Sequence, residues 1–457
     1  MAYDVTEKEL RTCNKTNRVL GQAQILLLKG GVKMKKRIGF FLVFLCIALL
    51  VFNSCNRDAN TLKIGDNIPD RSSGVGAVLE RINAEFISAN PGIRITTESY
   101  QDQPWQEKVR IYATANQLPD VMKYWSFPGM MLPLVNAGRL ATLDKNDFTG
   151  FGYMPGALEG NIYNGELYGI PVSADLWVLF VNKSLFERAG VPLPTTWEDI
   201  IASVPRFRAI NVTPVVTNGM EGWPLCIFFD NIVQRFNGDF TRLHKAIDDR
   251  SVSFNDADFI VAARYIQNLI RAGVFNANLT TSDYGDARNQ FGQERAAMYM
   301  MGAWEMSLAT DDNFSENFRE NLDVIKFPLI EGGRGTIDDL QAWFGGNYII
   351  ANSNKKELAV EYLKLLGAKF GEYAWEAGAF FPAQIVAPRP EDTLVARRLL
   401  QIASEATSTS GTPSLDRSTT IFKEDAQELI RQLSAMILTP EEFCRRLDMA
   451  AERAFRE

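Results

Sequence analysis

Residues 61–99 show the spacing of a strand, a helix and a second strand. Apolar and polar residues alternate in "TLKIGD" at 61–66 and recur in "IRITTES" at 93–99, as expected for strands. The helix expected between them carries its apolar residues on one face and ends at Asn90-Pro91-Gly92. Those apolar positions are Val75, Val78, Leu79, Ile82 and Phe86. A strand, a helix and a strand in so short a stretch are typical of a βαβ unit, so the pattern predicts an α/β fold with parallel sheet.

Expected helices and strands continue to alternate along the rest of the chain. Thr195 and Glu198 have the spacing of a capping box, which predicts a helix start. Further helices are expected over 105–116, 256–272, 355–366 and 420–455, the last broken near Thr439-Pro440, and further strands within 118–125, 168–183, 296–301 and 347–351. Ligands of open α/β sheets bind outside the carboxyl ends of the strands, so the residues there are the candidates for a site.

Tryptophan is concentrated at these positions. Five of the eight tryptophans fall at expected loops or strand ends, namely Trp125, Trp177, Trp223, Trp304 and Trp343. Trp105 and Trp197 stand at expected helix starts, and we assign them to core packing. Asp175, Glu305 and Asn347 lie close to the five in sequence.

These residue types suit a carbohydrate. An indole covers the apolar C–H face of a pyranose ring, a carboxylate accepts hydroxyl hydrogen bonds, and an amide both donates and accepts them. Asp175 and Glu305 are the expected acceptors. Each residue also has a structural interpretation, because any one tryptophan can pack in a core and either acid can serve as a cap or an ion-pair member. Their joint placement favours the ligand site.

Composition excludes several classes. The formal charge of −7 gives no basic face for nucleic acid. Gly345-Gly346 is surrounded by no phosphate-binding fingerprint, and no CxxC spacing predicts a metal site, so we expect neither cofactor nor metal. With His244 as the single histidine, a histidine-based catalytic triad is excluded. A glycosidase that uses Asp175 and Glu305 remains an alternative.

The N-terminal region predicts export. Met34 begins "MKKRIGFFLVFLCIALLVFNSC", in which three cations precede an apolar run from 40 to 52. This length and these flanks fit a signal peptide over 34–54 better than a membrane span. The run ends in a loose lipobox, so we expect cleavage and lipidation at Cys55. Residues 1–33 are then an extension or a misassigned start. They and the signal peptide hold nine of the 48 cations and three of the 55 acids, so the mature chain has a formal charge of −13.

Several stretches resemble the extracellular solute-binding proteins of bacterial ABC importers, of the sugar-binding type that includes maltose-binding protein. They are "LPDVMKYW", "YGIPVSADLWVLFVNKSLFERAGVPLPTTWEDI", "GQERAAMYMMGAWEM" and "GGNYIIANSNKKELAVEYLKLL". The resemblance covers nearly all of 61–455. It implies a two-lobe, type II periplasmic-binding-protein-like α/β fold with a hinge and an interlobe cleft. One lobe would comprise 61–172 and 327–372, and the other 174–324 and 376–457.

The resemblance also implies a function. The protein would bind a sugar in the cleft as a monomer and deliver it to ABC permease subunits, held to the cell membrane by lipid at Cys55 and facing the periplasm or the exterior. The site residues it implies are Tyr124, Trp125, Asp175, Trp177, Trp223, Trp304, Gly346 and Asn347. Polyamines or peptides remain alternative ligands for the same fold, and a surface adhesin is a further alternative role.

Overall fold

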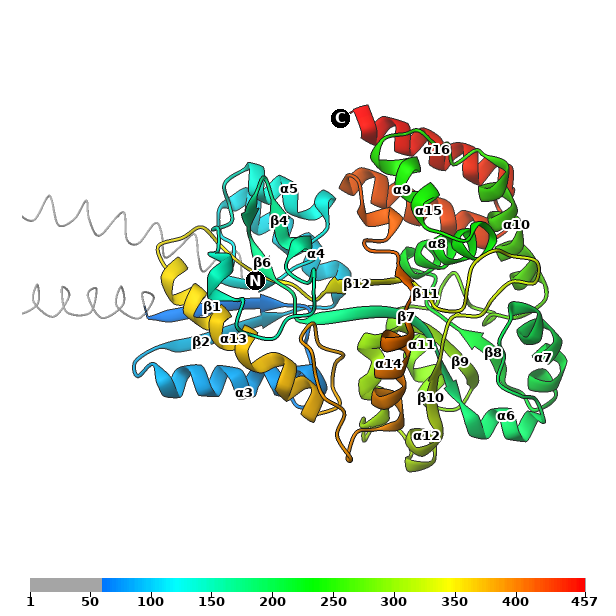
Figure 1. Ribbon diagram of the computed structural model, residues 1–457, viewed down its shortest axis with the longest axis horizontal. Coiled ribbons are helices and arrows are strands. Elements are labelled where there is room, and N and C mark those ends of the chain that lie inside the picture. Colours follow the sequence, from blue (N-terminus) through cyan, green and yellow to red (C-terminus); the bar gives the residue numbers. More distant parts are fainter. Residues whose placement is uncertain (1–59, 457) are drawn as a thin grey trace, which may run out of the picture. The chain divides into compact units, whose positions relative to one another are not determined.

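The computed structural model describes residues 60–456, which contain two main sheets. The first sheet has the strand order β2-β1-β3-β13-β6. Its strands are β1 (Thr61–Asp66), β2 (Arg94–Ser99), β3 (Val121–Lys123), β6 (Gly169–Ile170) and β13 (Tyr348–Ile350). Helices α3 (Gly74–Ala89) and α13 (Lys356–Glu376) pack against each other beside this sheet (Figure 1).

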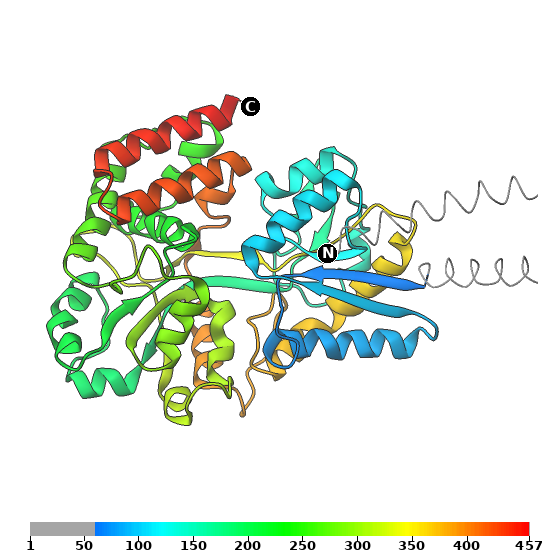
Figure 2. The same cartoon turned by 180° about the vertical axis from the view of Figure 1, so that it is seen from behind.

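The second sheet has the order β10-β7-β9-β8, and β12 pairs with β7 off this path. Its strands are β7 (Ser173–Asn182), β8 (Thr213–Val216), β9 (Ala296–Gly302), β10 (Leu322–Ile325) and β12 (Ala342–Gly345). Strand β7 is the longest of them and extends from the second sheet toward the first, as the view from behind also shows (Figure 2).

The other elements surround these sheets. The remaining α-helices are α4 (Asp102–Ala115), α5 (Pro128–Asn136), α6 (Lys183–Ala189), α7 (Trp197–Ala209), α8 (Trp223–Asn237), α9 (Thr241–Asp248), α10 (Ala257–Arg271), α11 (Tyr284–Gly292), α12 (Glu316–Asn321), α14 (Leu394–Glu405), α15 (Thr420–Ser434) and α16 (Pro440–Arg456). The short elements are β4 (Ile162–Tyr163), β5 (Glu166–Leu167), β11 (Asp339–Leu340), β14 (Ser408–Thr409) and the 3-10 turns η1 (Lys145–Asp147), η2 (Glu159–Asn161), η3 (Ala303–Ala309) and η4 (Ser414–Asp416). Within 60–456, no helix is both long and apolar enough to cross a membrane.

Each sheet has its own hydrophobic core. The cluster around the first sheet includes Ile64 and Tyr362, and the much larger cluster around the second includes Trp197 and Tyr299. A third, smaller cluster lies beneath α4 and α5 and includes Trp105. The two sheets therefore bury most of their apolar side chains in separate cores, and burial of each core stabilises its own sheet.

Three chain segments connect the sheets and are hydrogen-bonded to one another. The amide of Val172 donates to the carbonyl oxygen of Gly345 over 3.2 Å, and the amide of Ala174 donates to that of Phe381 over 3.0 Å. The amide of Ala383 donates back to the carbonyl oxygen of Val172 over 3.1 Å. These segments therefore form a narrow, ordered connection between two larger bodies of structure.

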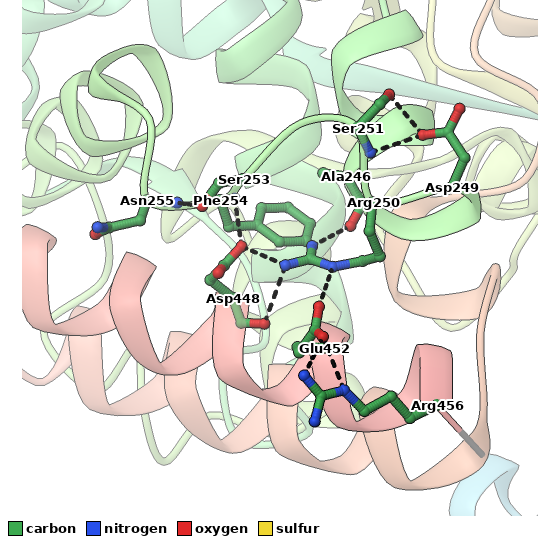
Figure 3. Close-up of polar contacts among 10 residues, drawn as sticks. All are labelled: Ala246, Asp249, Arg250, Ser251, Ser253, Phe254, Asn255, Asp448, Glu452 and Arg456. Atoms are coloured by element: carbon green, nitrogen blue, oxygen red, sulfur yellow. Dashed lines mark hydrogen bonds and ion pairs between the residues drawn. The ribbon is translucent and has the colours of Figure 1, made fainter.

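Ion pairs with Arg250, which follows α9, hold helix α16 in place. Figure 3 shows the guanidinium of Arg250 between Asp448 and Glu452 of α16, at 2.7 and 3.4 Å. Asp448 also accepts a hydrogen bond from the amide of Phe254. Arg250 has a φ of 56°, a conformation that costs a non-glycine residue free energy, and the network compensates for it.

The structure corrects the prediction of parallel sheet. Strands β1 and β3 are parallel, as are β8 and β9, but β13 is antiparallel to β3 and β6, and β7 is antiparallel to β9, β10 and β12. A βαβ unit gives parallel strands only when a crossover helix joins two strands of the same sheet. Strands β7, β12 and β13 adjoin segments that pass from one sheet to the other, so this expectation does not apply to them.

The helix predictions are confirmed apart from their boundaries. The capping box is formed by Thr196 and Asp199, one position later than expected. Helix α13 ends at Glu376, ten residues beyond the expected Leu366, because Tyr373 and Trp375 continue its buried face. Trp105 and Trp197 have no exposed surface, as expected of core residues.

Candidate functional site

Strand β7 brings three of the predicted residues together. Its Asp175 lies opposite Trp343 of β12, and its Trp177 lies opposite Gly302, the last residue of β9. Since the chain turns into η3 directly after Gly302, Trp304 comes back beside Trp177. The expectation that Trp177 and Trp343 stand at loops or strand ends was wrong, because both lie within strands of a continuous ladder.

Four indoles form one cluster. The ring centroid of Trp177 lies 6.0 Å from that of Trp223 and 6.1 Å from that of Trp304. Trp304 lies 6.0 Å from Trp223 and 6.2 Å from Trp343. Aromatic pairs at such separations attract one another, so the rings support each other as an array. We call these four residues the indole cluster.

The indole cluster lies where the separate cores meet. Trp177 is buried and forms its base, whereas Trp223, Trp304 and Trp343 are half-buried. Trp304 packs against the cores of both sheets, and Trp343 packs against the second-sheet core and the cluster beneath α4 and α5. Trp223 is the first residue of α8 and not part of a loop, because Gly222, at φ 78°, starts the helix there.

Gly302 makes room for one of these rings. A Cβ atom at this position would stand 2.1 Å from a ring carbon of Trp304. The indole therefore lies flat against bare backbone, and any larger residue would displace it. The position of Trp304 in the indole cluster depends on this glycine.

Tyr124 and Trp125 lie after β3, and their rings meet edge to face at 6.0 Å. Asn347 holds this loop: its carbonyl oxygen accepts from the amide of Tyr124 over 2.8 Å, and its side-chain amide donates to the hydroxyl of Ser126 over 2.7 Å. Its side-chain oxygen accepts from Asn161 over 2.7 Å. Because both ends of the buried Asn347 side chain have protein partners, its geometry is that of a positioning residue. Direct ligand contact by Asn347 stays a prediction.

Asp175 is buried against Gly345, which lies in the connection between the sheets. A Cβ at Gly345 would stand 2.0 Å from a carboxylate oxygen of Asp175, and Gly346 adopts a φ of 60°. Burial raises the pKa of Asp175 to about 6, while the neighbouring side chain of Ser173 and the charge of Lys123 oppose the increase. Asp175 is therefore a carboxyl group that changes ionisation close to neutral pH, beside the connection between the sheets.

Sequence reasoning missed two charged residues, Lys123, whose charge acts on Asp175, and Asp102, whose charge acts on Lys123. Burial lowers the pKa of Lys123, and the charges of Asp66, Asp175 and Asp102 oppose this change. Burial raises the pKa of Asp102 to about 6, opposed by Lys423 and Lys123. The available signal for Lys123 was a lysine directly after the two buried residues of a strand. Asp102, at the start of α4, resembles an ordinary helix-initiating acid and gave no signal.

Both carboxylate oxygens of Glu305 accept hydrogen bonds from neighbouring side chains. One carboxylate oxygen accepts from the hydroxyl of Tyr284, and the other accepts from Arg288 over 2.9 Å. Arg288 in turn pairs with Asp311 at 2.9 Å. The role of Glu305 as a ligand acceptor stays a prediction, and its contacts favour a role in positioning η3.

Across residues 60–456, no group of three or more histidines, cysteines or acids is arranged to hold a metal ion. Cys55 lies outside the described residues.

Comparison with known proteins places this geometry in a family. The bacterial extracellular solute-binding protein family matches residues 71–369, which is more than half of the chain. The chain belongs to this family. The multiple sugar-binding protein of Streptococcus mutans is 25% identical over 292 residues, which span 60% of this chain and 66% of that protein. The chain thus matches slightly less than two thirds of the length of this relative.

Solved structures share the fold. A protein from work on xylan utilization by the thermophilic bacterium Caldanaerobius polysaccharolyticus superimposes with a TM-score of 0.79 at 24% identity, over 85% of this chain and 99% of that one. A chitin oligosaccharide binding protein superimposes with a TM-score of 0.76 at 18% identity, over 87% of this chain and 99% of that one. This solute-binding protein therefore has the type II periplasmic-binding-protein fold, as the sequence predicted.

Proposed function

We propose that this solute-binding protein captures a sugar or oligosaccharide at the indole cluster and delivers it to the permease subunits of an ABC importer. The observation that carries the proposal is the meeting of four indoles at the junction of separately packed cores, with Asp175 beside them. Flat apolar faces with a nearby oxygen acceptor match the two surfaces of a pyranose. Relatives and structural neighbours named for sugars or oligosaccharides support the same ligand class.

The proposal includes closure of two lobes around the ligand. The sequence placed the return to the first lobe at 327, but β12 pairs with β7 in the second sheet and Phe327 and Leu340 pack in its core. The proposed lobes are therefore 61–172 with 346–376, and 174–344 with 384–456, and residues near 173, 345 and 381 form the hinge between them. A ligand that contacts both lobes binds the closed form better and raises its population. The protein is proposed to act as a monomer, which the permease recognises when closed.

We also propose that the protein binds without turnover. Glycoside hydrolysis needs two carboxyl groups that act on the glycosidic bond. Glu305 is committed to Tyr284 and Arg288, which leaves Asp175 without this partner. Incubation with chromogenic glycosides should therefore release no product.

Export and anchoring complete the proposal. The signal peptide at 34–54 would direct secretion, and lipid on Cys55 would hold the mature protein at the cell membrane. Bacterial lipoproteins carry several acyl chains, which anchor more firmly than one chain does. Mass spectrometry of the full chain expressed in a bacterium tests this: the N-terminal peptide should start at a lipid-modified Cys55, and Cys55→Ser should release the protein from membranes.

A thermal-shift screen tests the ligand class. Mono- and oligosaccharides, polyamines and short peptides are compared, since a ligand present at 100 times its Kd adds about 2.7 kcal/mol to the free energy of unfolding. We expect a sugar to raise Tm, and we expect Trp304→Ala to remove that shift. Phe236→Ala is the matched control, because Phe236 is also half-buried on the second-sheet core but lies outside the indole cluster and should keep the shift.

The screen also separates the alternatives. A shift with polyamines or peptides alone would keep the fold's binding role and reject the sugar. A sugar shift that survives both Trp304→Ala and Asp175→Ala would reject the site.

A further inference from the structure

One contact between the two sheets' structures lies outside the indole cluster. Helices α4 and α5 belong to the small core shared with the first sheet, whereas α15 belongs to the core of the second sheet. The start of α15 nevertheless meets both α4 and α5, and these elements face one another in the two views (Figures 1 and 2).

The contact combines backbone and side-chain interactions. Gly129 and Thr419 form an isolated parallel bridge, and the hydroxyl of Thr420 donates to the carbonyl oxygen of Gly129 over 2.8 Å. Arg110 of α4 pairs with Glu424 of α15 at 3.0 Å. We call residues 418–424, together with Arg110 and Gly129, the rim latch.

Lys423 adds a cation to the rim latch. Its ammonium lies 5.8 Å from the ring centroid of Phe127 and 4.0 Å from the sulfur of Met130, both at the start of α5. It pairs with Asp416 at 2.8 Å on its own side. Its charge also opposes the increase in the pKa of Asp102, which begins α4. The segment 418–424 therefore presents a hydroxyl, a cation and an acid to α4 and α5.

The close approach requires glycine at 129. A Cβ at this position would stand 2.1 Å from the carbonyl oxygen of Ser418 and 3.0 Å from the carbonyl carbon of Thr419. Gly129 lies at the second position of α5 and is not among the residues with positive φ, so its own backbone accepts alanine. Alanine is thus excluded only by the opposing segment and would be tolerated when the two sides are apart.

We infer that the rim latch is a conformational device that stabilises the closed form from outside the ligand site. Because its contacts join residues of different cores, they exist only while those bodies are together. Breaking them lowers the population of the closed form and weakens apparent ligand affinity by the same factor, although no ligand contact changes. The effect on affinity rests on the proposed function, whereas the effect on closure does not.

Spin-label distances test closure without a ligand. Ile111 and Ile421 are exposed neighbours of Arg110 and Thr420, and Cys226 and Cys444 are buried, so cysteines at 111 and 421 can be labelled selectively in mature protein without Cys55. We expect pulsed dipolar spectroscopy to show a short-distance population that Gly129→Ala depletes. Gly150→Ala is the matched control, since nothing lies within 4 Å of its Cβ position.

Charge reversal provides a second variant. Arg110→Glu should deplete the short-distance population, and addition of Glu424→Arg should restore it. With a sugar found by the screen, Gly129→Ala should raise Kd about tenfold by lowering the closed population by that factor. If neither Gly129→Ala nor Arg110→Glu changes the distance distribution, the rim latch is rejected. If the distances change but no sugar binds the unaltered protein, the proposed function fails and the latch stands.

Discussion

The tryptophans of this protein occur in two environments, and the difference separates packing from recognition. Trp197 has no exposed surface and is enclosed by Phe228, Phe275 and Phe327, with ring centroids 5.2 to 6.3 Å away. In the indole cluster, by contrast, Trp304 is half-buried and packs against the cores of both sheets. A ring enclosed within one core stabilises that core, whereas a half-buried ring between two cores can accept a third partner.

The two acids, Glu305 and Asp175, also differ in whether side chains of the protein already occupy their carboxylate oxygens. Glu305 is satisfied by Tyr284 and Arg288, so its contacts lie within the protein. Asp175 is buried, and its pKa is raised to about 6 because burial disfavours the ionised carboxylate. Hydroxyl donors of a sugar would stabilise the ionised form by hydrogen bonding.

The largest effect is expected from Trp197→Ala. Removal of a fully buried tryptophan from a close-packed core costs about 3–5 kcal/mol. Denaturant unfolding measures this loss, and the fraction that remains folded should bind sugar with unchanged Kd. A large loss of affinity with little loss of stability would break the comparison between the two sets of tryptophans.

Trp304→Ala should show the opposite pattern. We expect the free energy of unfolding to fall by about 1 kcal/mol, because the ring is only half-buried. Affinity should fall roughly 10- to 100-fold, or about 1.4–2.8 kcal/mol, because a stacking surface is lost. Calorimetric titration measures both the loss and its partial recovery in Trp304→Phe, which keeps a flat ring.

The pH dependence of binding reports on Asp175. Sugar hydroxyls donate to the ionised carboxylate, so protonation competes with the ligand, and Kd should rise as pH falls through about 6. One pH unit below that value, the increase is at most about tenfold. In Asp175→Asn, Kd should be nearly constant between pH 5 and 7, and an unchanged pH profile would remove Asp175 from the site.

The same pKa has a consequence for stability. Its folded value of about 6 lies above the unfolded value of 3.8, so the folded state binds more protons between these pH values. The contribution of Asp175 to stability therefore decreases as pH rises from about 4 to 6. Denaturant unfolding of the ligand-free protein and of Asp175→Asn isolates this contribution.

The smallest effect on binding is expected from Glu305→Gln. The amide still accepts a hydrogen bond from Tyr284, and Arg288 keeps its pair with Asp311, so η3 should hold its position. Sugar Kd should change by less than about threefold, since η3 keeps its position. The loss of the buried charge pair between Glu305 and Arg288 should instead lower the free energy of unfolding. A loss of affinity as large as that of Trp304→Ala would show that Glu305 contacts the ligand directly.

The sequence predicted most elements of the fold because their signals are local. The apolar spacing of α3 and α10, the break at Thr439-Pro440 and the βαβ unit at 61–99 depend on neighbouring residues. The antiparallel pairing of β7 with β9 and β12 could not be found in this way. It depends on a strand that leads from one sheet toward the other, and no short stretch of sequence encodes its partner.

The candidate site could be predicted in composition but not in contacts. Spacing and chemistry selected Trp177, Trp223, Trp304 and Trp343, which the structure brings into one cluster. The commitment of Glu305 to Arg288 depends on how η3 folds against α11, which the sequence does not reveal. The burial of Asp102 depends likewise on long-range packing.

A crystal structure of the protein with an oligosaccharide from the thermal-shift screen would show directly whether the indole cluster binds sugar. We expect a pyranose face stacked on the ring of Trp304 or Trp343, with a hydroxyl group within hydrogen-bonding distance of the Asp175 carboxylate. A sugar bound away from the four indoles, with those rings still packed only against one another, would contradict this expectation.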